Sequence, residues 1–149
     1  MTEAQAVTGP RRWSALAALA ALVVSGLVVV AFAPDDTAGS DIAGDALYAA
    51  AVYATVVLIA PRLRPVAVAA IAAGWCIAVE LFQLTGIPLA AGAAFAPAML
   101  VLGTVFDPRD LAIYSLTVAV ACAIDASIGT VSRTRVGRAG SEGRGIRAP

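Results

Sequence analysis

The chain has 149 residues, of which 60% are hydrophobic and 13% are charged, and its formal net charge is zero. Soluble domains contain roughly 45–50% apolar and about 25% charged residues, so this composition excludes an ordinary soluble domain and indicates an integral membrane protein. Because lipid offers the backbone no hydrogen-bonding partner and the apolar segments are about 20 residues long, we expect one all-α domain, a polytopic transmembrane helical bundle.

The first apolar segment, Trp13–Ala33, follows Arg11 and Arg12 and is long enough to span a bilayer. Residues 1–12 form the predicted cytoplasmic N-terminal segment, and its polar part, residues 1–10, is expected to be disordered. The end of the apolar segment also resembles a signal-peptide cleavage site, Ala-Phe-Ala. It is longer than the ~7–15 residues of a signal peptide's apolar region, so we favour an uncleaved helix.

The second and third predicted spans are Ala43–Ala60 and Val66–Leu84. An acidic loop, residues 34–41, precedes the second span, and a turn with two arginines and two prolines, residues 61–65, separates the two spans. Proline cannot continue one helix but suits the first turn of the next, so this turn sets a boundary. Residues 85–88, Thr-Gly-Ile-Pro, then end the third helix.

Residues 89–105 are apolar but interrupted by Gly92, Pro97 and Gly103, so they form either a re-entrant segment or a fifth span. The last span is predicted from Phe106 to about Thr130, which places the transmembrane domain at residues 13–130. Residues 131–149 carry five arginines and one glutamate and are rich in glycine and serine, which predicts a disordered basic cytoplasmic tail. The tail has no interleaved aromatic residues, so no nucleic-acid partner is expected.

Arginine positions predict the topology, because cytoplasmic loops are enriched in basic residues. Arg11 and Arg12, the 61–65 turn and the tail should all be cytoplasmic, and the acidic 34–41 loop should lie outside. Four full crossings with a re-entrant segment at residues 89–105 satisfy this pattern. Five crossings would leave the basic tail outside, although later loops can violate the rule.

Glu80 is the most informative residue, since an ionisable side chain inside a membrane helix costs at least a few kcal/mol and usually faces a bundle interior or a wet cavity. Gln83 lies three residues later, on the same helical face. With four crossings, acidic side chains from three spans meet these two residues at the extracytoplasmic side. The expected group is Asp45, Glu80, Gln83, Asp107 and Asp110.

Structural roles compete with this interpretation for several residues. Asp107 before Pro108 and Asp110 fit the first turn of a helix, where a cap and an acid stabilise the positive end, and Asp45 has the same explanation. Tyr114 fits an interfacial aromatic belt. Arg109 is either the counter-ion of the acids or an interface residue. Asp125 is expected to pair with Arg133 near the inner boundary.

Metal and cofactor signals are weak. The chain has no histidine, the commonest transition-metal ligand, and the carboxylates show no diagnostic spacing for Ca²⁺, Mg²⁺ or Mn²⁺. We therefore predict no metal site and no cofactor.

A set of short motifs resembles a known family. These are Gly44–Tyr48 (GDALY), Glu80–Gln83 (ELFQ) and Leu102–Asp107 (LGTVFD), followed by Asp110 and Tyr114. In this order they resemble the bacterial membrane family numbered 2809 among the domains of unknown function. The resemblance implies a small polytopic protein and marks these residues as a shared site, but it implies no reaction.

The resemblance spans roughly residues 24–128, with one departure: Thr117 stands where the family pattern has a glycine after the tyrosine. The order of acids also resembles, distantly, the VanZ-like proteins, which are linked to glycopeptide resistance and the cell envelope. The arginine that those proteins carry after the glutamine is absent here, where residues 85–88 follow.

Four functions fit these observations. The first is a multi-pass protein of the bacterial plasma membrane whose outward-facing acidic pocket binds a lipid-linked or cationic envelope molecule. The second is an intramembrane metal-dependent enzyme with Glu80 as general base, and the third is a proton- or cation-coupled carrier, which at this size would need to be a homo-oligomer. The fourth is a purely structural membrane subunit. In each case the lipid bilayer is the expected partner.

Overall fold

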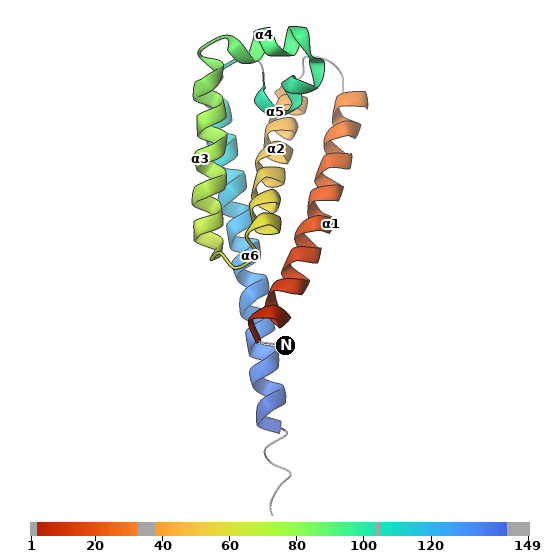
Figure 1. Ribbon diagram of the computed structural model, residues 1–149, viewed down its shortest axis with the longest axis vertical. Coiled ribbons are helices and arrows are strands. Elements are labelled where there is room, and N and C mark those ends of the chain that lie inside the picture. Colours follow the sequence, from red (N-terminus) through yellow and green to blue (C-terminus); the bar gives the residue numbers. More distant parts are fainter. Residues whose placement is uncertain (1–2, 33–37, 104, 143–149) are drawn as a thin grey trace, which may run out of the picture.

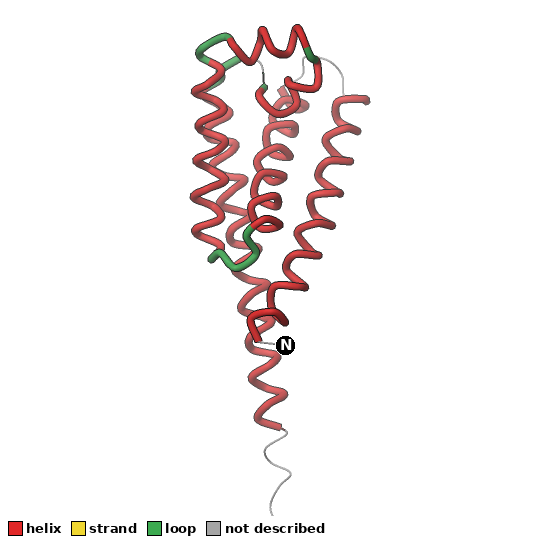
Figure 2. Tube along the Cα trace, viewed as in Figure 1, coloured by secondary structure: helices red, strands yellow, loops and turns green. Residues whose placement is uncertain are grey.

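The computed structural model describes residues 3–32, 38–103 and 105–142, and these residues form helices joined by short turns, with no strand among them (Figure 2). The elements are α1 (Glu3–Phe32), α2 (Ala38–Ile59), α3 (Pro65–Gln83), α4 (Ile87–Ala94), the 3₁₀ helix η1 (Ala96–Ala98), α5 (Met99–Leu102) and α6 (Pro108–Glu142).

Four of these helices are long and apolar enough to cross a membrane. The candidate spans are Gly9–Phe32, Gly39–Ile59, Pro65–Gln83 and Pro108–Gly129. The predicted all-α, multi-pass helical fold is therefore confirmed, and each predicted span lies within a few residues of the observed one.

The segment between α3 and α6 does not cross the bundle. Figure 1 shows α4 lying across one end of the long helices, with α5 folded back toward α2. We call this end the α4 end; α1 begins and α6 ends at the opposite end. The helical arrangement thus matches the predicted four crossings with a re-entrant segment, and which end faces the outside stays a prediction.

Glycine and proline divide the apolar re-entrant segment into short pieces. Gly86 has a φ of 70° and Gly103 has a φ of 65°, a left-handed region that residues with a Cβ rarely adopt. A Cβ at Gly92 would overlap the side chain of Met99, so this glycine allows α5 to pack against α4. Apolar composition alone therefore did not produce a spanning helix here.

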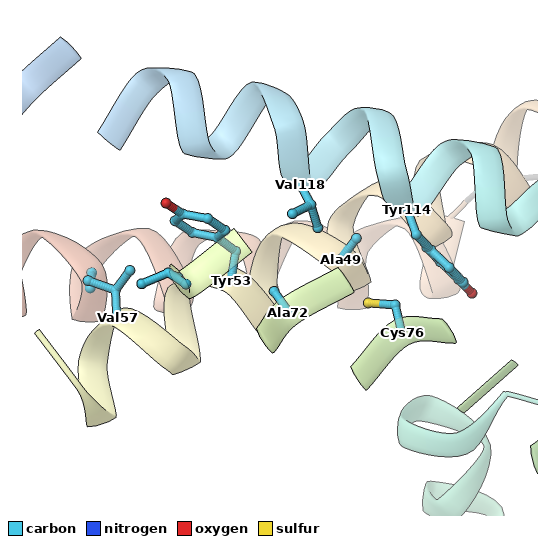
Figure 3. Packing of buried hydrophobic residues seen from close by; sticks show 9 residues of the cluster. Ala49, Tyr53, Val57, Ala72, Cys76, Tyr114 and Val118 are labelled. Carbon is cyan, nitrogen blue, oxygen red and sulfur yellow. The ribbon is translucent and has the colours of Figure 1, made fainter. Parts of the chain in front are cut away.

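The buried core lies between α2, α3 and α6 and is built largely from small side chains (Figure 3). Ala49 and Ala72 are completely buried, and Val118 packs beside them. In lipid, helices associate through close packing rather than through the hydrophobic effect, and small residues permit that close approach. Among the described residues, α1 packs against α2 alone of the other helices, which makes it a peripheral helix.

Three helices extend beyond the expected boundaries, and one of them is α2, which begins at Ala38 within the predicted 34–41 loop. α1 begins at Glu3, within the segment expected to be disordered, and α6 continues to Glu142 rather than ending near Thr130. Residues 131–142 contain no proline to stop the helix, so polarity there marks the end of the span and not the end of the helix.

At the end opposite α4, Arg11 connects α1 to the α2–α3 turn and to α6. Its guanidinium donates hydrogen bonds to the carbonyl oxygens of Pro61 and Leu63, both at 2.7 Å, and to the Asp125 carboxylate, with Nε to Oδ1 at 3.1 Å. The hydroxyl of Tyr53 also donates to Asp125, at 3.0 Å. The partner of Asp125 is thus Arg11, from the start of the chain; the side chain of the expected partner, Arg133, lies outside the described residues.

Candidate functional site

The two polar residues of α3 are buried at the α4 end. Glu80 is fully buried and Gln83 is 7% exposed, so both are held inside the bundle as predicted for an interior-facing pair. Their positions near the end of α3 place them beside the residues that lead into α6. This proximity decides what they contact.

Both side chains hold the backbone that connects α5 to α6. Glu80 Oε1 accepts a hydrogen bond from the backbone N–H of Asp107 at 2.7 Å, and Gln83 Nε2 donates to the carbonyl oxygen of Leu102 at 3.0 Å. A Cβ at position 103 would overlap Gln83 Nε2, so only glycine fits at this position. The two motifs therefore contact each other, through Gln83 with Leu102 and through Glu80 with Asp107.

Three buried oxygen atoms at this end have no hydrogen-bond partner within the described residues. They are Glu80 Oε2, Gln83 Oε1 and Asp110 Oδ1. A buried acceptor without a partner costs about 1–3 kcal/mol, and each such group in a native protein calls for a reason. The Gln83 oxygen is an acceptor, and so are the two carboxyl oxygens when the acids are ionised, so in that state whatever satisfies them must donate a hydrogen bond or carry positive charge.

The start of α6 combines capping with ion pairing. Asp107 Oδ1 accepts a hydrogen bond from the backbone N–H of Arg109 at 2.9 Å, which is the expected cap. The guanidinium of Arg109 lies 3.9 Å from Asp41, 3.7 Å from Asp107 and 3.8 Å from Asp110. The Arg109 side chain is 42% exposed, so each pair contributes little energy, and together they make Arg109 the local counter-ion.

Asp45 of α2 and Asp110 of α6 form a second close pair. Their carboxyl groups lie close enough to interact electrostatically, and the hydroxyl of Tyr114 donates to Asp45 Oδ1 at 3.4 Å. Two carboxylates this close repel unless a proton or a cation lies between them. Tyr114 is only 6% exposed and belongs to the core, so the expected role in an interfacial belt does not apply.

A cavity of about 330 Å³ lies next to this cluster, between α1, α2 and α5. Its walls are mainly apolar, and four polar side chains also line it: Asp45, Tyr48, Gln83 and Tyr114. The Tyr48 hydroxyl is fully engaged, since it donates to the carbonyl oxygen of Val101 at 2.8 Å and accepts from Trp75 Nε1 at 3.0 Å. The remaining hydrogen-bonding capacity on Asp45 and Gln83 consists of acceptor oxygens and the second N–H of the Gln83 amide.

All seven residues singled out from the sequence lie at the α4 end, but they do not form one pocket wall. Asp45, Gln83 and Tyr114 line the cavity, whereas Glu80, Asp107, Arg109 and Asp110 do not. Sequence reasoning missed Asp41 as a partner of Arg109 and the face of α1 that closes the cavity. The membrane-spanning part of α1 is apolar on every side, so no amphipathic pattern could indicate which of its faces packs inward.

The described residues contain no group of three or more acidic or cysteine side chains placed to hold a metal ion. We therefore assign no metal site to the cluster.

Four apolar spans, a re-entrant segment and a buried acid held at one end define a small multi-pass helical membrane protein. The model of a family described as a protein of unknown function (DUF2809) matches residues 35–118, more than half of the chain. The chain belongs to this family, which confirms the resemblance seen in the motifs. No curated protein and no solved structure matches the chain, and the likeness to VanZ-like proteins stays a prediction.

Proposed function

We propose that this protein binds a cell-envelope molecule through a positively charged group, which sits at the α4 end against Asp45 and Gln83. Five carboxyl groups gather at this end of the described chain, and Arg109 is the one arginine among them. The acids are Asp41, Asp45, Glu80, Asp107 and Asp110. This excess of negative charge favours a cationic partner.

The observation that carries the proposal is the orphaned amide oxygen of Gln83. This oxygen is buried without a hydrogen-bond partner on a side chain that lines the cavity, and the Asp45 carboxyl group lines the same cavity. An ammonium group offers three donors and no acceptor, so it would pair with the Asp45 carboxyl group and lie beside the Gln83 amide. A phosphate or carboxylate would face the Asp45 carboxyl group there and would be repelled by it.

The basic segments support an outward-facing site. If the arginines of the 61–65 turn are cytoplasmic, as the positive-inside rule predicts, the α4 end faces the other side of the membrane. In a bacterial plasma membrane that side meets the cell envelope, which is why we propose an envelope molecule as the ligand.

A thermal-unfolding assay with butylamine tests the proposal. A ligand that binds only the folded state raises Tm in a saturable way, so purified protein should show such a rise with butylamine and not with butanol. Asp45→Asn should abolish the rise. Asp41→Asn, which removes an exposed acid of the same cluster outside the cavity, should preserve it. An equal rise with butanol, or an undiminished rise in Asp45→Asn, would overturn the proposal.

A purely structural role is the second candidate, and one observation favours it. Glu80 and Gln83 both bind backbone groups of the connection between α5 and α6, so part of the polar cluster is accounted for by holding that connection in place. Absence of any Tm rise with butylamine would favour this second candidate.

The carrier hypothesis gains no support from the core. The hydroxyl groups of Tyr53 and Tyr114 point in opposite directions along the bundle, and Ala49, Ala72 and Val118 fill the space between them (Figure 3). The polar groups at the two ends are thus separated by an apolar layer, with no polar route for a proton or cation among the described residues.

A further inference from the structure

We propose that the cavity between α1, α2 and α5 holds a single hydrocarbon chain, so that the ligand is a long-chain amine. This inference rests on the proposed function, because the ammonium group of the same molecule occupies the Asp45 and Gln83 end of the cavity. It goes further by assigning the apolar walls to the chain of that molecule.

The walls have the chemistry that a hydrocarbon chain requires. The α1 side is formed by Leu22, Gly26 and Leu27 among others, and the α5 side by Met99 and Leu100. None of these side chains offers a hydrogen bond or a charge. A polar ligand filling the cavity would leave its own groups unsatisfied, so the part that enters must be apolar.

The volume fits one chain. A methylene group takes up about as much room as a water molecule, whose share of liquid volume is about 30 Å³. The cavity of about 330 Å³ therefore accommodates roughly ten methylene groups of a single chain. A two-chain lipid would have to leave its second chain outside.

The position of α1 provides a way in. Among the described residues α1 packs only against α2, and few residues of its span are buried, so no other helix separates this side of the cavity from lipid. Figure 1 shows α1 diverging from α6 toward the α4 end. A chain already dissolved in the bilayer can enter sideways while its ammonium group stays at the membrane surface, next to the acidic cluster.

The surrounding lipid limits how much free energy the hydrocarbon chain contributes to binding. A chain that moves from bilayer to cavity leaves one apolar environment for another, so it gains little hydrophobic free energy. Its role is to place the ammonium group against Asp45 and Gln83. We therefore expect both the charge and the chain to be needed for binding in a membrane.

Photolabelling with hexadecylamine that carries a diazirine near the middle of its chain tests this inference. The full-length protein is placed in phosphatidylcholine vesicles, and labelled peptides are mapped by mass spectrometry. Labelling of the cavity faces of α1 and α5 should saturate and should be competed by unlabelled hexadecylamine but not by hexadecanol. Unsaturable labelling throughout would overturn the inference.

Two glycine substitutions separate the cavity from the lipid-facing surface. Gly26 lines the cavity and a Cβ there meets no atom within 4 Å, so Gly26→Leu projects into the cavity. Gly74 is exposed on α3 with equally open space, so Gly74→Leu is the matched control. Gly26→Leu should lower saturable labelling about tenfold, equivalent to about 1.4 kcal/mol, and Gly74→Leu should leave it unchanged. Gly44→Val, at another open cavity position, provides a second filling variant.

The outcomes separate failure of this inference from failure of the proposed function. If Gly26→Leu and Gly44→Val label like the wild type while butylamine still gives a rise in Tm that depends on Asp45, the chain subsite is wrong and the proposed function stands. If hexadecanol competes and Asp45→Asn labels normally, recognition of the amine fails, and the long-chain amine assignment fails with it.

Discussion

Glu80, an acid that is costly to bury in a membrane, is hydrogen-bonded to the backbone and not paired with a cation. One of its oxygens accepts the Asp107 N–H, and the other has no partner within the described residues. A buried backbone N–H that lost this acceptor would be left without a partner, at a cost of about 1–3 kcal/mol. The residue therefore fixes the entry into α6, and with it the positions of Asp107 and Asp110.

Two replacements of Glu80 should separate the contribution of its packing to stability from the contribution of its hydrogen bond. Glu80→Leu leaves the Asp107 N–H without its acceptor, so we expect a loss of about 1–3 kcal/mol in the free energy of unfolding, measured by denaturant titration in detergent micelles. Glu80→Gln retains an acceptor oxygen at the same place and should lose clearly less. Equal losses in the two variants would mean that the contact with Asp107 contributes nothing.

At the scale of single residues, the sequence predicted which side chains matter better than it predicted their partners. The cost of burying Glu80 and the capping pattern at Asp107 follow from local chemistry, and both were found in the expected region. The binding of Glu80 to a backbone N–H, and the pairing of Asp125 with Arg11, join residues far apart in the chain. Local patterns contain no information on such contacts.

Among the elements, α1 differs from the other long helices in how it is held. It packs on α2 alone, and Arg11 fastens its lower part to the α2–α3 turn and to α6. The upper part, which lines the cavity, has no comparable polar contact among the described residues. The cavity side of α1 is therefore held by its packing on α2 and not by polar contacts.

Loss of the Arg11 contacts should loosen α1. Arg11→Leu removes the donor to the Pro61 and Leu63 carbonyl oxygens and the partner of Asp125, so we expect a drop of about 1–3 kcal/mol in the free energy of unfolding. The group is partly exposed, which keeps the loss below that of a buried ion pair. The neighbouring Arg12 is exposed, and Arg12→Leu should change stability by less than half as much. Similar losses in both variants would contradict the anchoring role.

Element boundaries followed from the sequence where apolar length and proline determine them, as at the 61–65 turn and the re-entrant segment. The predicted spans were close, but the helices continue beyond them into polar residues at the start of α1, at the start of α2 and at the end of α6. The packing of α1 could not be predicted, because a helix that is apolar all round has no distinct face to bury.

The whole molecule has two polar ends of different character, separated by the apolar layer between Tyr53 and Tyr114. At the end with Arg11 the partly buried acid Asp125 is neutralised by Arg11, whereas the α4 end has an excess of acids and orphaned acceptors. A molecule built this way is asymmetric across the membrane. Its function therefore depends on which end faces outside.

Cysteine labelling in intact cells determines that orientation. In a Cys76→Ala, Cys122→Ala background, Thr85→Cys lies in the turn before α4, and Arg62→Cys lies in the α2–α3 turn. The positive-inside rule predicts that a membrane-impermeant thiol reagent labels Thr85→Cys in intact cells, and labels Arg62→Cys and Ser141→Cys only after permeabilisation. Labelling of Ser141→Cys together with Thr85→Cys would instead require a fifth crossing. The reverse pattern, with Arg62→Cys labelled and Thr85→Cys protected, would place the acidic end in the cytoplasm, and an envelope ligand could no longer reach Asp45 from outside.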